Sequence, residues 1–340
     1  MRILVTGGAG FIGSHLVRRL LADPRNHVIN LDALRYSGNL ENLADVAGHP
    51  RYAFVHGDIC DAAVVERVLK EHGIQAVVNA AAETHVDRSI LDPNSFAKTD
   101  VVGTAVLLEA SRKAKVERYL QVSTDEVYGS VETGASTEED PLAPRSPYAA
   151  SKAGGDLLVC SYWTTYRFPV LITRGSNTYG PNQYPEKFIP LCVTNAIDDQ
   201  PLPIYGDGRY RRDWLWVEDH CSAIEHVLLN GRPGTVYNVG GGNERENIAV
   251  AEMILKQLGK PMSLIRFVED RPGHDRRYAV DCSRLRALGW APAVPFEEGL
   301  QTAVDWYRSH EGWWRKIKSG EFRAYYEQMY GKRLREGVTG

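Results

Sequence analysis

The first part of the chain alternates short apolar runs with longer stretches in which apolar residues recur at helical spacing. The runs at 3–5, 28–31, 52–55 and 76–78 have the length of buried strands, and the stretches 11–21 and 62–70 between them predict helices. A further helix is predicted from the stripe Ala97, Val101, Ala105 and Leu108, with Pro93 suited to its first turn. Such alternation is typical of βαβ units with a parallel sheet.

The same alternation continues and then becomes irregular. We expect a strand at 119–122, a helix at 148–166 and a strand at 169–173. From Gly180 onward Pro, Gly and aromatic residues are frequent, which indicates loops between short elements. The stretch 214–239 again has a strand, helix and strand pattern. We therefore predict a domain over 1–181 to which the chain returns at 214–242, and a smaller lobe made of 182–213 and 243–332.

Composition narrows the class of protein. Hydrophobic residues make up 43% of the 340 residues and charged residues 24%, so the chain can bury a core of its own. A net charge of -3 without a basic stripe makes nucleic acid an unexpected partner. The five cysteines are scattered without a CxxC pair, which argues against disulfides and a structural zinc site, and we expect no metal. Neither a signal peptide nor a membrane span is visible, so we expect a cytoplasmic protein.

A glycine-rich turn directly follows the first predicted strand and opens the first helix. Gly7, Gly10 and Gly13 have the spacing GxxGxxG, which allows a tight turn and the close approach of a pyrophosphate. Asp32 ends the second predicted strand, where a carboxylate accepts hydrogen bonds from ribose and repels a 2'-phosphate. These features predict a Rossmann-type, doubly wound α/β sheet that binds NAD. The alternative is a surface turn with an incidental aspartate. Asp58 is expected either at the adenine or in a plain loop.

Tyr148 and Lys152 form a YxxxK pair, one helical turn apart, so both side chains leave the same face of a helix. A nearby ammonium and the positive nicotinamide ring favour the phenolate of a tyrosine, which then serves as a base for an alcohol. The pair alone is also compatible with an ordinary surface helix. Ser123 and Thr124, at the end of the strand before it, add hydroxyls that can bind a substrate oxygen.

Together, the glycine turn, the Ser123–Thr124 strand end and the YxxxK pair resemble the extended short-chain dehydrogenase/reductase family over nearly the whole chain. Within that family, Thr124-Asp125-Glu126-Val127-Tyr128-Gly129 is similar to the dTDP-glucose 4,6-dehydratases. The resemblance implies that Thr124, Asp125, Glu126, Tyr148 and Lys152 are catalytic. Independently of the resemblance, two adjacent carboxylates at a strand end are suited to acid and base catalysis. The alternative is that they belong to an acidic loop exposed to solvent.

The resemblance also implies which other residues form the site. For NAD these are Gly7, Gly10, Phe11, Ile12, Gly13, Asp32, Asp58, Ile59, Ala80, Ala82, Thr99, Tyr148 and Lys152. For a nucleotide sugar they are Thr84, His85, Asp87, Thr124, Asn177, Glu186, Lys187, Tyr205, Arg212, Asn247, Arg271 and His274. Arg212 and Arg271 resemble diphosphate-binding arginines, since a guanidinium fork fits paired phosphate oxygens, but a surface salt bridge is the alternative. Relatives are expected to have Cys at Gly175 and Asn at Thr178.

The activity that the resemblance implies is dTDP-glucose 4,6-dehydration, by oxidation at C4, elimination of water across C5 and C6, and return of the hydride to C6. In this scheme Tyr148 takes the C4 hydroxyl proton, Glu126 removes the C5 proton and Asp125 protonates the leaving hydroxyl. The alternatives are a nucleotide-sugar 4-epimerase or decarboxylase of the same family and a non-catalytic NAD-sensing protein. The substrate is expected to be dTDP-glucose or a similar nucleotide sugar, and a homodimer is the family expectation.

Overall fold

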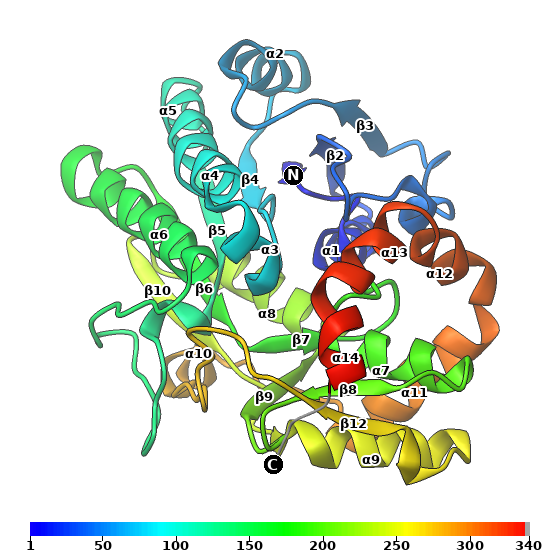
Figure 1. Ribbon diagram of the computed structural model, residues 1–340. Coiled ribbons are helices and arrows are strands. Elements are labelled where there is room, and N and C mark those ends of the chain that lie inside the picture. The colour runs from blue at the N-terminus through cyan, green and yellow to red at the C-terminus, as the bar shows by residue number, and fades with distance from the viewer. Residues whose placement is uncertain (337–340) are drawn as a thin grey trace.

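A computed structural model describes residues 1–336, and its largest sheet has seven parallel strands (Figure 1). Their order is β10-β6-β5-β4-β1-β2-β3. The strands are β1 (Arg2–Thr6), β2 (His27–Asp32), β3 (Tyr52–His56), β4 (Ala76–Asn79), β5 (Arg118–Thr124), β6 (Val170–Gly175) and β10 (Thr235–Val239). The direction of strand addition reverses between β1 and β4, so the predicted doubly wound, Rossmann-type sheet is confirmed.

Helices cover both faces of this sheet, and alternate residues of each strand pack against opposite layers. Ile3 and Val5 of β1 belong to the core formed with α1 (Phe11–Ala22) and α8 (Val217–Asn230). Leu4 belongs to the second core, on the other face. That core is completed by α2 (Ala62–His72), α5 (Thr104–Lys113) and α6 (Pro147–Tyr166). Burial on both faces explains why the strands read as continuous apolar runs.

The segment between β4 and β5 differs from the single helix expected there. It comprises α3 (Val86–Leu91), α4 (Pro93–Phe96), a π-helical stretch at Ala97–Gly103 and then α5. Pro93 lies in the first turn of α4, as predicted. The π-helical stretch lies against α6, where a Cβ at Gly155 would come within 2.8 Å of the Asp100 carbonyl oxygen. The close approach buries the side chains of Thr99 and Asp100 between the two segments.

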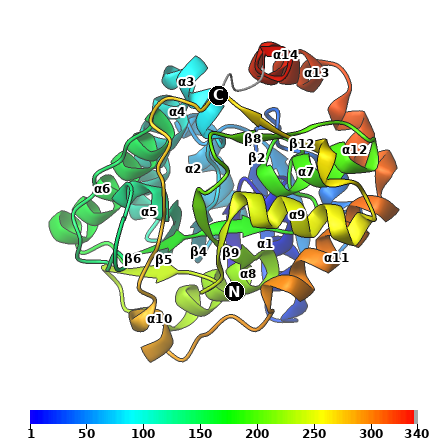
Figure 2. The ribbon, with the colours of Figure 1, turned by 60° about the horizontal axis from the view of Figure 1, so that its bottom comes forward.

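Two small sheets lie beyond the carboxyl end of β6. One has the order β11-β9-β7 and the other pairs β12 with β8. Their strands are β7 (Asn177–Tyr179), β8 (Leu202–Tyr205), β9 (Arg211–Trp216), β11 (Glu244–Glu246) and β12 (Ile265–Val268). The accompanying helices are α7 (Phe188–Ile197), α9 (Asn247–Leu258), α10 (Ser283–Ala287), α11 (Phe296–Ser309) and α12 (Glu311–Lys318). Figure 2 shows α7, α9 and α12 on the side of the molecule away from α5 and α6.

The chain crosses between these parts of the molecule more than once. The predicted strand at 214–216 is part of β9, which pairs with β7 and β11 and not with the large sheet. The chain then enters α8, which packs on α1, and β10, which pairs with β6 in the large sheet. The division into lobes at 182–213 and 243–332 stays a prediction.

The last described helices contact segments from much earlier in the chain. These are α13 (Glu321–Tyr326) and α14 (Lys332–Glu336), drawn in red in Figure 1. The Tyr325 hydroxyl lies 3.1 Å from Nδ1 of His85, and the hydroxyl oxygens of Tyr205 and Tyr330 lie 3.4 Å apart. Within residues 1–336, no helix combines the length and the apolar character that crossing a membrane requires.

Candidate active site

A cleft runs along the carboxyl ends of the large sheet and starts at the turn between β1 and α1. Gly7 has a φ of +69°, and a Cβ there would lie 2.7 Å from the Ala81 Cα. A Cβ at Gly13 would lie 2.1 Å from the Gly7 carbonyl oxygen. Both positions therefore require glycine, because the turn folds back tightly on itself and on the chain after β4.

The turn is suited to hold the pyrophosphate of a dinucleotide. Helix α1 begins at Phe11, and its N-cap Gly10 supplies no side-chain hydrogen bond to the first amides, which point at the cleft. Thr99 is 5% exposed, and its Oγ1 has no hydrogen-bond partner within residues 1–336. The cleft is lined by every residue predicted for NAD: Gly7, Gly10, Phe11, Ile12, Gly13, Asp32, Asp58, Ile59, Ala80, Ala82, Thr99, Tyr148 and Lys152.

Asp32 braces the glycine turn from the end of β2. Its Oδ2 accepts a hydrogen bond from the Ala9 amide at 2.9 Å, and its Oδ1 accepts one from the Leu34 amide at 2.7 Å. Burial raises the pKa of this carboxyl, and the two amides act against that rise. The carboxylate is thus fixed at the wall of the cleft, where it has further lone pairs for a ribose.

Arg35 joins the cofactor end of the cleft and was not singled out from the sequence. Its guanidinium lies 2.8 Å from Oδ2 of Asp58 and 2.6 Å from Oε1 of Glu83. Asp58 therefore has an ion-pair partner in addition to its place on the cleft wall. The two carboxylates neutralise a cation that would otherwise attract a 2'-phosphate.

The residues predicted to be catalytic meet where β5 ends. Thr124 caps the 3-10 turn Asp125–Tyr128: its Oγ1 accepts from the Glu126 amide at 3.3 Å and donates to Asp125 Oδ1 at 3.2 Å. Tyr148 and Lys152 come from the first turns of α6, which Ser146 caps through the Ala149 amide at 3.1 Å. All five residues line the same cleft: Thr124, Asp125, Glu126, Tyr148 and Lys152.

The hydrogen-bond partner of Lys152 is not the phenol of Tyr148, near which the YxxxK spacing was expected to place it. Its Nζ donates to the Val122 carbonyl oxygen at 2.9 Å and not to the phenol of Tyr148. Burial raises the pKa of Tyr148 well above its usual value, and the carboxylates of Glu126, Asp100 and Asp125 act in the same direction. A hydrogen bond with Thr124 opposes the rise. The protein's own groups therefore keep the phenol protonated, and a cationic nicotinamide ring would act in the opposite direction.

The two adjacent carboxyls have different surroundings. Burial, Glu126 and Asp213 raise the pKa of Asp125 well above its usual range. Burial also raises the pKa of Glu126, but three cations act against it: Arg271, Arg212 and Lys187. Asp125 is therefore the better proton donor and Glu126 the better proton acceptor, a division of roles that suits acid and base catalysis.

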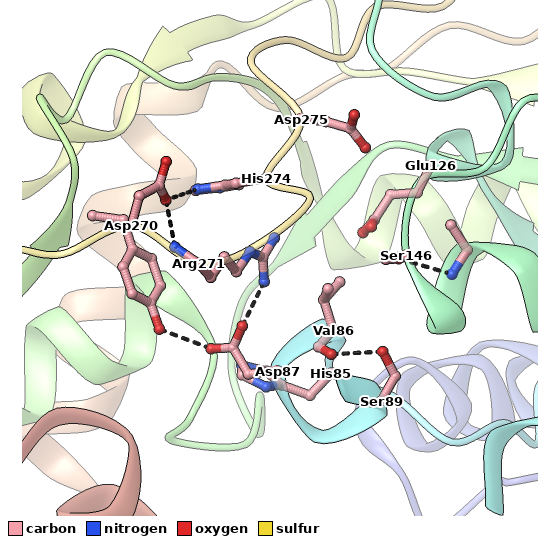
Figure 3. Close-up of polar contacts among 12 residues, drawn as sticks. His85, Val86, Asp87, Ser89, Glu126, Ser146, Asp270, Arg271, His274 and Asp275 are labelled. Atoms are coloured by element: carbon pink, nitrogen blue, oxygen red, sulfur yellow. Dashed lines mark hydrogen bonds and ion pairs between the residues drawn. The ribbon is translucent and has the colours of Figure 1, made fainter. Parts of the chain in front are cut away.

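Of the residues predicted for the sugar nucleotide alone, Thr84, Asn177 and Lys187 line the cleft. The others do not line it, and several form a polar cluster beside Glu126 (Figure 3). The predicted residues that do not line the cleft are His85, Asp87, Glu186, Tyr205, Arg212, Asn247, Arg271 and His274. Figure 3 shows the Glu126 side chain directed into the space between Asp275 and Arg271.

An ion pair organises this cluster. Nη1 of Arg271 lies 2.8 Å from Oδ1 of Asp87, whose Oδ2 accepts a hydrogen bond from Tyr205 at 2.9 Å. Arg212 is 5% exposed and donates to the carbonyl oxygens of Asp275 and Arg211, at 2.9 Å and 2.8 Å. No carboxylate within residues 1–336 forms an ion pair with Arg212, so a buried cation is left for an anionic ligand.

The remaining predicted residues have internal partners. Glu186 accepts from Nε of Arg88 at 2.7 Å. His85 has a φ of +141° and lies 3.1 Å from the Tyr325 hydroxyl, so its ring is held in a strained backbone position. Nδ1 of His274 lies 2.7 Å from Oδ1 of Asp270. Asn247 begins α9, and its Oδ1 is buried without a hydrogen-bond partner in the described part of the chain.

The two positions that depart from the expected family residues share one neighbour. A Cβ at Gly175 would lie 2.6 Å from the ring of His220, and Oγ1 of Thr178 lies 2.7 Å from Nδ1 of that ring. Burial lowers the pKa of His220 to about 4, so the imidazole is neutral. Gly175 thus leaves the space that His220 fills, and His220 lines the cleft at this point.

Four residues at the site were not predicted from the sequence. Arg35, His220, Asp275 and Tyr278 reach the site from four different segments. Arg35 lies three positions after Asp32, and Asp275 follows His274 directly, so proximity to predicted residues was the available signal. His220 and Tyr278 offered none, because their places depend on packing between distant segments.

The chain has many relatives. Residues 4–303 match the family model described as GDP-mannose 4,6 dehydratase. A dTDP-glucose 4,6-dehydratase of Streptomyces niveus is 52% identical over 325 residues, which cover 94% of this chain and 96% of the relative. The dTDP-glucose 4,6-dehydratase 1 of Escherichia coli K12 is 46% identical over 357 residues, with 97% and 99% covered.

Solved structures agree with these matches. DesIV, a dTDP-glucose 4,6-dehydratase of Streptomyces venezuelae solved with NAD, has a TM-score of 0.91 and 52% identity, over 94% of this chain and all of that one. A UDP-glucose 4-epimerase of Thermus thermophilus, also solved with NAD, has a TM-score of 0.85 and 33% identity, over 91% of this chain and all of that one. The fold is thus shared by dehydratases and epimerases. This chain belongs to the GDP-mannose 4,6-dehydratase family, within the extended short-chain dehydrogenases/reductases.

Proposed function

We propose that this protein is an NAD-dependent dTDP-glucose 4,6-dehydratase, a hydro-lyase that forms dTDP-4-keto-6-deoxyglucose. The observation that carries the proposal is the Asp125–Glu126 pair, which lines the same cleft as Thr124, Tyr148 and Lys152. A 4-epimerase needs the base and the cofactor but has no use for two further carboxyls of different proton affinity. The relatives named dTDP-glucose 4,6-dehydratase support the same activity.

The glycine turn, Asp32 and Thr99 would hold NAD along the first half of the cleft. When bound, NAD would supply hydride transfer from C4 of the sugar and back to C6, so the reaction would have no net redox change. The tight contacts at Gly7 and Gly13 let the backbone approach the pyrophosphate. Asp32 would bind the adenosine ribose.

Tyr148 acts first, as the base that removes the proton of the C4 hydroxyl. Thr124 orients the same oxygen, because its hydroxyl lies at the junction of β5 and the Asp125–Tyr128 turn. Lys152 fixes the end of β5 through the Val122 carbonyl, one helical turn along α6 from Tyr148. A Tyr148 phenolate forms only when positive charge offsets the burial that raises its pKa.

Elimination follows from the acidity that the C4 ketone gives to the C5 proton. Glu126, which faces three cations, removes this proton as base, and Asp125 donates its proton to the C6 oxygen as the C–O bond breaks. Water leaves and a C5–C6 double bond forms. The two adjacent side chains thus act on neighbouring carbons of one substrate.

The nucleotide sugar would extend from the catalytic residues toward the polar cluster. Arg212 and Arg271 bind its diphosphate, in line with the buried charge of Arg212 that no carboxylate within residues 1–336 neutralises. The rest of the substrate site consists of Thr84, His85, Asp87, Asn177, Glu186, Lys187, Tyr205, Asn247 and His274. Asp87 and Tyr205 serve mainly to hold Arg271 in place.

The protein is further proposed to act as a homodimer in the cytoplasm. Val102, Leu157 and Tyr166 are large apolar side chains that are 53%, 61% and 51% exposed on the face of α6 and the adjoining π-helical stretch. Covering such a face is a common role of subunit contact. All five cysteines are unpaired, as expected in a reducing compartment. Sedimentation at several concentrations would test the dimer.

The proposed activity is tested by incubating the protein with NAD and dTDP-glucose deuterated at C4. A dehydratase gives a 4-keto product, detected by its absorbance in alkali, with the deuterium at C6. A product that retains the deuterium at C4 would identify an epimerase. Binding of NAD without any turnover would favour a sensor protein.

A further inference from the structure

The hydroxyl of Tyr278 lies near two carboxyls, those of the buried Asp275 and the half-buried Glu126. It donates a hydrogen bond to Oδ2 of Asp275 at 2.8 Å, and Oε2 of Glu126 lies 3.4 Å away on its other side. Tyr278 is 3% exposed and Asp275 is 2% exposed. Neither residue lines the cleft itself, so both act behind Glu126.

Arg212 and Arg145 fix the position of this hydroxyl. The guanidinium of Arg212 lies 4.4 Å from the ring centroid of Tyr278 and donates to the Asp275 carbonyl oxygen at 2.9 Å. Nη1 of Arg145 forms an ion pair with Oδ1 of Asp275 at 3.2 Å. The ring and the carboxylate are therefore each held by a cation, and the phenol cannot turn away from Glu126 without breaking these contacts.

A phenol has one proton, and the contact with Asp275, at 2.8 Å, is much shorter than the contact with Glu126, at 3.4 Å, so we assign the proton to the Asp275 hydrogen bond. Burial raises the pKa of Tyr278 well above its usual value, with Glu126 acting in the same direction, so the proton stays on the phenol. Toward Glu126 the hydroxyl therefore presents an oxygen lone pair. A lone pair repels an ionised carboxylate but accepts a hydrogen bond from a protonated carboxyl.

We propose that Tyr278, oriented by Asp275, is a positioning residue that accepts a hydrogen bond from Glu126 once Glu126 has taken the C5 proton. This role rests on the proposed function, but the hydrogen bond is a property of the protein itself. In the elimination, the C5–H electron pair forms the C5–C6 double bond, and the C6–O pair leaves with the proton of Asp125. The C5 proton rests on Glu126, and Tyr278 keeps its own proton throughout.

Besides Tyr278, several charged or ionisable groups face Glu126 and affect its proton affinity. The cations favour its ionised form, and the acidic groups favour its protonated form. These groups are Arg271, Arg212, Lys187, Asp275, Asp125 and Tyr148. The cations alone would make Glu126 a weak base, and the Tyr278 acceptor restores part of its proton affinity.

The first test measures the proton affinity of Glu126 without substrate. The carboxyl of Glu126 is titrated by infrared difference spectroscopy, with Glu126→Gln identifying its band, in the parent protein and in Tyr278→Phe. Loss of the acceptor should lower the Glu126 pKa by about one pH unit, since one hydrogen bond is worth about 1 kcal/mol. The matched control is Tyr119→Phe, a buried tyrosine whose hydroxyl donates to Gln121 away from the cleft.

An unchanged or higher Glu126 pKa in Tyr278→Phe would overturn the proposal whether or not the protein is a dehydratase. If Tyr278→Phe does not fold, 3-fluorotyrosine incorporated at position 278 tests the same contact. The ring fluorine makes the phenol oxygen a weaker acceptor and leaves the Asp275 charge in place, so the Glu126 pKa should again fall. A Glu126 pKa that stays at the parent value in that protein would likewise refute the role.

The second test separates the positioning role from a merely structural one. In single turnovers, Tyr278→Phe should form bound NADH as fast as the parent but eliminate water about tenfold more slowly, so NADH accumulates. The acid limb of the pH profile should move to lower pH, because the base ionises at lower pH. Equal slowing of oxidation and elimination would overturn the proposal. If the parent protein does not oxidise dTDP-glucose, the proposed function is refuted. The titration of Glu126 then decides on its own whether Tyr278 has the proposed role.

Discussion

Arg271 and Asp87 form an ion pair with 2.8 Å between Nη1 and Oδ1, across 184 positions of the chain. Asp87 lies in α3, and Arg271 lies in the loop after β12. The pair holds the guanidinium beside Glu126 and leaves its Nε without a hydrogen-bond partner in the described part of the chain. One arginine thereby links the substrate cluster to the proposed base.

Arg212→Ala and Arg271→Ala should each weaken binding of dTDP-glucose by about tenfold or more, and leave NAD binding nearly unchanged. The reason is the loss of a charge-assisted hydrogen bond to the diphosphate. Calorimetric titration with each ligand measures the difference. Arg276→Ala is the matched control, because this arginine pairs with the exposed Asp207. Substrate affinity equal to the parent's in both variants would disprove the assigned site.

Arg271→Ala should also reduce the free energy of unfolding, by about 3 kcal/mol, since it leaves the Asp87 carboxylate buried without its partner. Denaturant unfolding gives this value, and Arg212→Ala should show a smaller loss because Arg212 has no ion pair within residues 1–336.

NAD should bind much more tightly than NADP. The carboxylate of Asp32 repels a 2'-phosphate, and Arg35 is already neutralised by Asp58 and Glu83. Fluorescence titration with both reduced cofactors measures the ratio. Asp32→Asn should narrow it. Equal affinities in the parent would show that Asp32 does not contact the ribose.

Tyr148→Phe should reduce turnover by about 10²-fold or more, because it removes the base for the C4 hydroxyl and keeps the ring that packs edge-to-face on Phe96. The control is Tyr166→Phe at the exposed end of the same helix. Turnover is followed by the 4-keto product. Near-normal turnover in Tyr148→Phe would place the base elsewhere.

The double variant Asp125→Asn, Glu126→Gln should oxidise C4 but not eliminate water, so bound NADH accumulates and is visible by its absorbance. In heavy water the parent should place solvent deuterium at C5 of its product, and the variant should not. Glu139→Gln with Asp140→Asn is the matched control, because these adjacent carboxylates are exposed. A product without solvent label from the parent would exclude the elimination.

Stability should fall with rising pH where Asp100 ionises. Burial raises its pKa from 3.8 to about 6, so between about pH 4 and pH 6 the folded state holds a proton that the unfolded state has released. The change in the free energy of unfolding that Asp100→Asn causes should therefore be about 3 kcal/mol more favourable at pH 8 than at pH 3.5. Urea unfolding at both values measures this. A difference that does not depend on pH would contradict the ionisation argument.

The sequence was sufficient for elements whose local signals agree. The glycine turn, Asp32 and the YxxxK pair are set by short spacings, and the structure gathers them along one cleft. The bond from Lys152 to the Val122 carbonyl could not be foreseen, because it depends on how closely α6 packs on β5. The place of His220 depends equally on the missing side chain at Gly175. Contacts of this kind arise from tertiary packing and leave no pattern along the chain.

The matched family region ends at residue 303, but the chain continues through α12 to α14 and comes back to His85 and Tyr205. The family segment therefore ends before the helices that contact the proposed substrate residues. A recombinant fragment trimmed at 303 would contain every strand of the parallel sheet, but it would lose Val304, Tyr307 and Trp314 from the core and expose His85 to solvent. Substitutions in this tail would act on His85 and Tyr205, which are proposed for the sugar nucleotide, and would not touch the glycine turn of the cofactor half. For protein engineers, the tail is thus a separate point of access to specificity.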